Sequence, residues 1–121
     1  MTTSPKPTEN AFLWLTKIIS GVLIIVILIL HLIVNHFTAP NGLLSYAEVV
    51  AYYQNPLIPI MEGFFLIFVV THSLIGLRSI LLDLKPTRSA MNIIDGGLTL
   101  FGLVAIVYGI WLLFAIAQNP I

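Results

Sequence analysis

The fold is decided by the stretch EGFFLIFVVTHSLIGLRSILLD, which covers residues 62–83. It is apolar almost throughout, and about 20 residues of α-helix are enough to cross the hydrocarbon core of a bilayer. At about 100° per residue, four of its residues fall on one narrow stripe that is about 16 Å long, namely His72, Gly76, Ser79 and Asp83. The stretch therefore predicts a transmembrane helix with one polar stripe.

The stripe contains one histidine, His72. An imidazole deep in an apolar helix is costly to leave without a partner. Gly76, one turn further on, removes side-chain bulk where a flat ligand can lie. Together these features favour a buried ligand, with haem as the leading candidate. The competing interpretation is that His72 hydrogen-bonds to a neighbouring helix, as polar residues often do in membranes.

The composition extends this prediction to the whole chain. Of the 121 residues, 59% are hydrophobic and only 8% are charged, and the mean hydropathy is +1.05. Such values are far from those of soluble domains. We predict an all-α membrane protein in which a flexible tail (1–12) precedes a three-helix transmembrane domain (13–121), with helices at about 13–37, 57–84 and 91–117.

A short interfacial helix is expected between the first two spans. The sequence TAPNG at residues 38–42 ends the first helix. Ser45 is then followed three residues later by Glu48, which is the spacing of a capping box. This helix carries the tyrosines that suit a membrane interface, Tyr46, Tyr52 and Tyr53.

Several other residues are expected to be structural. Ser20 is interpreted as a small packing residue, Glu62 as a near-surface acid and Asp95 as the cap of the third helix. Small residues let transmembrane helices approach closely. The third helix is expected to use four glycines in this way, Gly96, Gly97, Gly102 and Gly109.

Charge and cysteine content exclude several functions. The chain has no cysteine, so it supplies neither thiolate ligands for iron–sulfur clusters nor disulfides. Its formal net charge is zero, and no basic patch is dense enough to hold a nucleic acid. The first apolar run is too long for a secretory signal, and the tail before it has no arginine, unlike a mitochondrial presequence.

Orientation follows from the basic residues, which lie before the first helix or around the end of the second. They are Lys6, Lys17, Arg78, Lys85 and Arg88. By the positive-inside rule, the amino terminus and the 85–90 loop are cytoplasmic and the carboxy terminus is outside. We therefore expect a multi-pass protein of a prokaryotic inner (cytoplasmic) membrane.

The histidines are expected to lie at different depths. At 1.5 Å per residue, His31 lies about 21 Å beyond Lys17, whereas His72 lies about 16 Å from Asp83. One haem cannot use both as axial ligands, but two haems stacked across the membrane can take one each. His36, at the outer boundary, is expected to be solvated. Since no third histidine lies at the depth of His72, its haem needs a second ligand from a partner protein.

The residues of the second helix resemble a known family. The pattern HxxxGxRxxxxD at residues 72–83 resembles the second-helix signature of the small cytochrome b anchor subunits of succinate dehydrogenase (succinate:quinone oxidoreductase). Residues 45–62 look like the segment that leads into that helix, and Ser20-Gly21 followed by His31 is similar to the first-helix element of the family. The resemblance covers roughly residues 14–117.

This resemblance implies half of a heterodimeric anchor bundle in the respiratory chain and tricarboxylic acid cycle. With a second anchor subunit, the chain would bind one or two haem b groups and quinone beneath an iron–sulfur subunit and a flavoprotein subunit, without succinate chemistry of its own. His72 matches a haem iron ligand, and His31 matches the outer-haem ligand of di-haem members. Other roles implied are haem propionate contacts for Lys17 and Arg78 and quinone binding for Ser20, Arg78 and Asp83.

Departures from the family and alternatives stay open. Trp14 and Ile18 stand where C-type anchors have quinone-contacting residues, and Leu84 replaces the quinone-binding tyrosine of D-type anchors. The sequence is compatible with either anchor type, with menaquinone or ubiquinone, and with succinate oxidation or fumarate reduction. The alternative functions are a haem-free docking anchor and a small proton-coupled transporter with a relay of His72, Arg78 and Asp83.

Overall fold

The computed structural model describes residues 10–119 as helices joined by short loops. The order is α1 (Ala11–Leu32), a π-helical turn η1 (Ile33–Phe37), α2 (Tyr46–Tyr53), α3 (Leu57–Asp83) and α4 (Arg88–Ala117). The predicted all-α fold is confirmed: three helices are long and apolar enough to cross a membrane, and a shorter one accompanies them.

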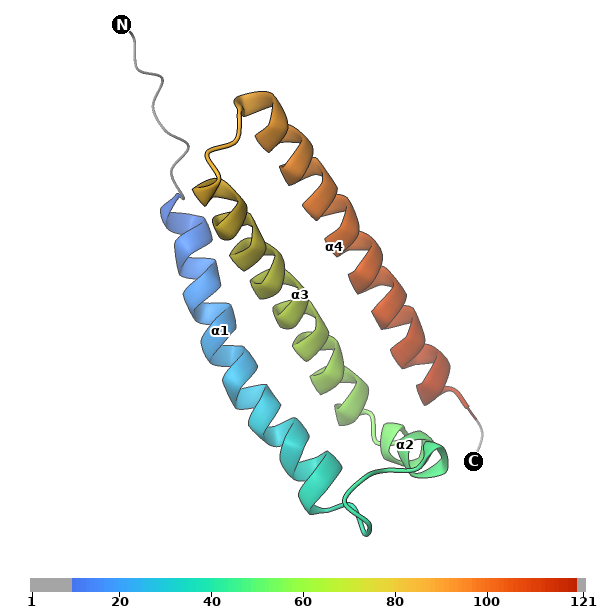
Figure 1. The fold of residues 1–121 in the computed structure, drawn as a ribbon. Coiled ribbons are helices and arrows are strands. Elements are labelled where there is room, and N and C mark those ends of the chain that lie inside the picture. The colour runs from blue at the N-terminus through green and yellow to red at the C-terminus, as the bar shows by residue number, and fades with distance from the viewer. Residues whose placement is uncertain (1–9, 120–121) are drawn as a thin grey trace, which may run out of the picture.

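The three long helices form a row. Figure 1 shows α3 between α1 and α4, with α2 lying across the end at which α3 begins. Within the described residues, α3 packs against both long neighbours, whereas no Cα atom of α1 lies within 8 Å of one in α4. Large apolar side chains therefore face outward along all three helices. Such surfaces suit lipid or another membrane helix rather than water.

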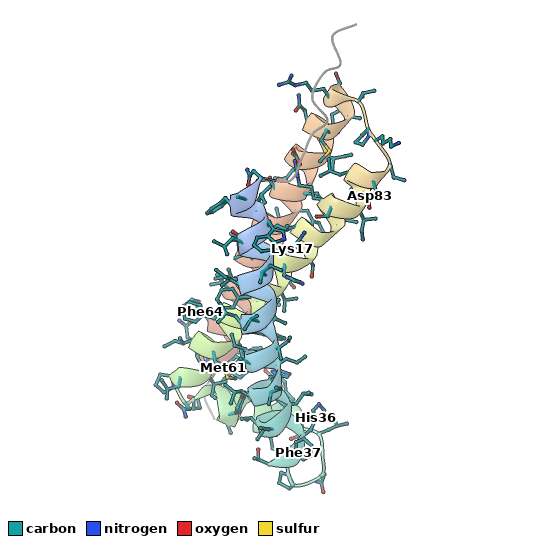
Figure 2. All side chains as sticks on the ribbon, turned by 90° about the vertical axis from the view of Figure 1, so that its left-hand side faces the viewer. Lys17, His36, Phe37, Met61, Phe64 and Asp83 are labelled. Atoms are coloured by element: carbon teal, nitrogen blue, oxygen red, sulfur yellow. The ribbon has the colours of Figure 1, made fainter. Side chains whose placement is uncertain are left out.

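The two ends of the bundle carry different residues. Figure 2 shows Lys17 and Asp83 toward the end at which α3 gives way to α4, and His36 and Phe37 at the opposite end. The other basic residues that the structure describes also lie toward the Lys17 end, since α3 ends there and α4 begins there. The basic residues thus gather at one end, as the predicted orientation requires; Lys6 lies outside the described residues.

Two helices begin earlier than the apolar runs suggested. Asn10 caps α1 by accepting a hydrogen bond of 2.8 Å from the backbone N–H of Leu13. Thr87 caps α4 by accepting one of 3.2 Å from that of Ala90. The prediction that Asp95 caps this helix was therefore wrong. Polar capping residues precede the first apolar residue of a helix, so a search for apolar periodicity starts too late.

Glycines bring α4 close to α3. A Cβ atom on Gly102 would lie 2.6 Å from Cδ1 of Leu74, and one on Gly109 would meet the side chain of Leu66. The predicted close packing is confirmed at these two positions. Gly96 and Gly97 instead face open space within this chain.

The predicted interfacial helix is also present. Ser45 Oγ accepts from the backbone N–H of Glu48, and the Glu48 carboxylate accepts from the backbone N–H of Ser45 at 2.6 Å, so the capping box is complete. At the far end of α3, Lys85 adopts a φ of 51° and is followed by Pro86. A left-handed residue and a proline end the helix there.

Candidate functional site

His72 lies in the contact seam between α1 and α3. Its Nδ1 is 3.1 Å from the backbone oxygen of Lys17 and 3.2 Å from Ser20 Oγ. The Ser20 hydroxyl also donates to the Lys17 oxygen, at 3.1 Å. A carbonyl oxygen only accepts, so the bond to Lys17 requires the proton on Nδ1. The lone pair of the ring is then on Nε2, which has no hydrogen bond within the described residues.

The His72 ring is closely packed on one side and has open space on another. A Cβ on Gly21 of α1 would lie 3.1 Å from Cε1 of His72, so the α1 backbone rests against one edge of the ring. A Cβ on Gly76, one turn along α3, would meet nothing within 4 Å. The ring is thus held from α1, while the space predicted beside Gly76 is open. This arrangement suits a flat ligand on Nε2.

His31 lies in the same seam, farther along it. Its Nδ1 is 2.9 Å from Oε1 of Glu62 on α3, and its ring stacks on Phe65 with centroids 5.6 Å apart. Glu62 is only 9% exposed, so this acid is buried in the seam. The helix rotation that turns Glu62 toward α1 also brings it within 3.5 Å of the Tyr52 hydroxyl. The apolar run alone did not indicate this rotation.

The two histidines are well separated along the bundle. His31 meets Glu62, ten residues before His72 on α3, which corresponds to about 15 Å of helix. His36 lies beyond His31 and its Nδ1 is 2.9 Å from the backbone oxygen of Gly42. No group of three or more His, Cys, Asp and Glu residues that could hold a metal ion occurs in residues 10–119.

Arg78 belongs to a different seam. Its Nε and Nη2 donate to Oδ1 and Oδ2 of Asp95 on α4, at 2.7 and 3.4 Å. Six residues of α-helix rotate Arg78 about 240° from His72, which explains why one faces α4 and the other α1. The structure does not bring Arg78 to the His72 seam. The role of Asp95 as its partner was missed, because the sequence alone did not fix the rotation of α4.

The three residues predicted to bind quinone are spread out. Ser20 is 4% exposed and contacts His72, whereas Asp83 is exposed at the end of α3. Ser20 lies at the level of His72, and eleven residues of α3 separate His72 from Asp83. Eleven residues of α-helix span about 16 Å. Arg78 lies between these levels on the α4 side. The structure therefore gathers Ser20 with His72 and Lys17, but not with Arg78 and Asp83.

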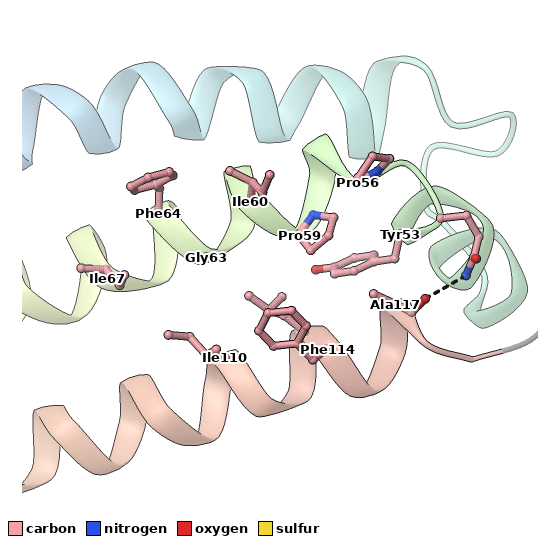
Figure 3. Close-up of a pocket in the computed structure, with 12 residues that line it drawn as sticks. Tyr53, Pro56, Pro59, Ile60, Gly63, Phe64, Ile67, Ile110, Phe114 and Ala117 are labelled. Atoms are coloured by element: carbon pink, nitrogen blue, oxygen red, sulfur yellow. Dashed lines mark hydrogen bonds between the residues drawn. The ribbon is translucent and has the colours of Figure 1, made fainter.

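An apolar pocket that the sequence did not indicate opens between α3 and α4. Its volume is about 540 Å³, and it is closed at one end by α2. Figure 3 shows the Tyr53 ring reaching into it beside Pro59 and Phe114, and the bond from Gln54 Nε2 to the Ala117 oxygen. Burial, followed by the negative charge of Glu62, raises the pKa of Tyr53 to about 12, so the phenol remains neutral at physiological pH.

The sequence is similar to known proteins over most of its length. Residues 2–115 match the family described as succinate dehydrogenase/fumarate reductase transmembrane subunit. The chain belongs to this family. The anchor is also 34% identical, over 113 residues, to the succinate dehydrogenase hydrophobic membrane anchor subunit of Archaeoglobus fulgidus. That alignment covers 93% of the anchor and 96% of its relative.

Membership of this family confirms the resemblance seen in the second helix. The anchor is a multi-pass membrane protein of a succinate dehydrogenase or fumarate reductase, and such an anchor implies the other subunits of that enzyme and a membrane. The family favours this function over a small transporter. The seam of His72 and His31 is its candidate functional site.

Proposed function

We propose that the anchor binds haem b through Nε2 of His72 and a second haem through Nε2 of His31, and that it contributes to electron transfer to quinone. The observation that carries this proposal is the bond from His72 Nδ1 to the Lys17 carbonyl. Ligating histidines commonly donate their other N–H to a carbonyl or carboxylate, which fixes the tautomer and the ring orientation. Both histidines have such a partner.

The residues of the seam fit such a group. Lys17 and Ser20 hold the proton of His72 on Nδ1, while Gly76 leaves space one turn away. When bound, haem b supplies one-electron transfer beside the route to quinone. A haem held by His72 or His31 would need a further ligand from the second anchor subunit, since this chain has only three histidines and His36 bonds the Gly42 loop.

Quinone is proposed to bind at the end of the bundle that carries the basic residues. Asp83 is exposed there and suits ordering water and supplying protons to the reduced quinone. Arg78 supplies a guanidinium one to two turns from that end and is also the proposed partner, with Lys17, of haem propionates. The iron–sulfur and flavoprotein subunits dock on this face, which we assign to the cytoplasmic side of the inner membrane.

The test is a reduced-minus-oxidised absorption spectrum, with the ratio of haem to flavin, of the complex purified through a tag on this chain. About two haem b per flavin are expected. His72→Ala and His31→Ala should each remove one, while His36→Ala, the matched control, should remove none. A complex that contains flavin but no haem would overturn the proposal of haem binding and would leave the role of a haem-free docking anchor. A complex without flavin would overturn the docking role as well.

A further inference from the structure

The most polar part of the seam is a cluster at its far end, formed by His31, Asn35, Tyr52 and Glu62. These residues come from α1, η1, α2 and α3. Oε1 of Glu62 accepts from His31 Nδ1 at 2.9 Å and from the Tyr52 hydroxyl at 3.5 Å. Asn35 Nδ2 donates to the His31 carbonyl at 2.9 Å. A carboxylate inside a membrane-spanning helix is expensive, and its placement therefore calls for a function.

The two histidines differ in the charge of their partner. His72 Nδ1 meets a neutral carbonyl and a hydroxyl, whereas His31 Nδ1 meets a carboxylate. A carboxylate that accepts the Nδ1 proton increases the electron donation of Nε2 more than a neutral acceptor does, because negative charge passes into the ring. Electron donation from an axial ligand stabilises the oxidised iron. Hydrogen bonding around the ligand is thus one of the means by which a protein adjusts a haem potential.

We propose that Glu62 is a positioning residue for His31: it fixes the Nδ1–H tautomer and lowers the midpoint potential of the haem that His31 ligates. This inference rests on the proposed function, since it takes His31 as a ligand. Tyr52 moderates the effect by donating to the same oxygen, and Phe65 fixes the plane of the ring by stacking on it.

A purely structural role for Glu62 makes a different prediction. If the carboxylate only tied α1 to α3, any acceptor of the same shape would replace it without a change at the iron. Glu62→Gln is such an acceptor, since its amide oxygen can still take the Nδ1 proton but carries no charge. The midpoint potential of the haem, and not the stability of the complex, therefore distinguishes the two roles of Glu62.

The experiment is a redox titration of the haem absorption bands in the whole complex, purified through a tag on this chain. His31→Ala first identifies which haem depends on His31. Glu62→Gln is then expected to raise the midpoint potential of that haem and to leave the other unchanged. Glu48→Gln, which neutralises a carboxylate on α2 that is hydrogen-bonded to Ser45, is the matched control and should shift neither.

Two results would overturn the inference, and they are distinguishable. If His31→Ala removes no haem, the ligand role proposed for His31 fails and the inference fails with it. If His31→Ala removes one haem but Glu62→Gln leaves its potential unchanged, only the role of Glu62 fails. Should Glu62→Gln not assemble, Tyr52→Phe replaces it. Removing that donor strengthens the bond of Glu62 to His31, so a small shift to lower potential is expected, and no shift or a rise counts against the proposal.

Discussion

Arg78 of α3 and Asp95 of α4 form an ion pair in which Nε lies 2.7 Å from Oδ1. The pair joins the two helices that meet at the cytoplasmic end of the proposed orientation. It uses the guanidinium that the family resemblance had linked to propionates and quinone. Any contact of Arg78 with a propionate or quinone is therefore made by a side chain that Asp95 already holds. Substitutions at Asp95 remove the ion pair but keep the guanidinium, and so separate its role in the ion pair from its proposed role in binding.

A double-mutant cycle of Arg78→Gln and Asp95→Asn tests the strength of this pair. The Asp95 side chain is 43% exposed in the chain, and solvent screening limits such pairs to a coupling energy of about 1 kcal/mol or less. The measurement is the free energy of unfolding of the complex in mixed detergent. A coupling of several kcal/mol would mean that another subunit or lipid buries the pair.

Gly21 is predicted to control the position of His72. Gly21→Ala places Cβ 3.1 Å from Cε1 of the ring, which a shift of a few tenths of an ångström accommodates. Gly21→Val is bulkier and is expected to displace the ring and lower the haem-to-flavin ratio by loss of the His72 haem alone. Gly97→Val is the control, since Gly97 faces open space. Equal loss with both variants would point to a general defect in folding.

The loss of stability caused by replacing a glycine of α4 with alanine should depend on the position of that glycine. A Cβ on Gly109 meets three atoms of Leu66, while one on Gly102 is blocked chiefly by Leu74 Cδ1. Overpacking costs typically about 1–3 kcal/mol, so we expect Gly109→Ala to lower the thermal dissociation temperature of the complex most, Gly102→Ala less, and Gly97→Ala not at all. The reverse order would mean that the leucine side chains rotate away freely.

The sequence predicted those features that depend on local pattern. Apolar runs gave the three spans, and the spacing of Ser45 and Glu48 gave the capping box. What depends on the relative rotation of two helices was not predictable. Arg78 and Asp95 are 17 residues apart and meet only because two helix faces coincide. Burial of Glu62 likewise follows from the contact of α3 with α1 and α2, which periodicity in one apolar helix does not specify.

The stability of α2 is predicted to depend on pH through Glu48. Hydrogen bonds from the backbone and side chain of Ser45 hold the pKa of Glu48 below its usual value of 4.5. A carboxyl whose pKa is lower in the folded state stabilises that state above its unfolded pKa, and the contribution disappears as pH falls through the lowered value. Hydrogen exchange of the α2 amides, corrected for intrinsic rates, should therefore accelerate below about pH 4.5 in the native chain. Glu48→Gln keeps the acceptor without the charge, so its exchange should change much less over that range; an equal acceleration in both would assign the pH dependence to another group.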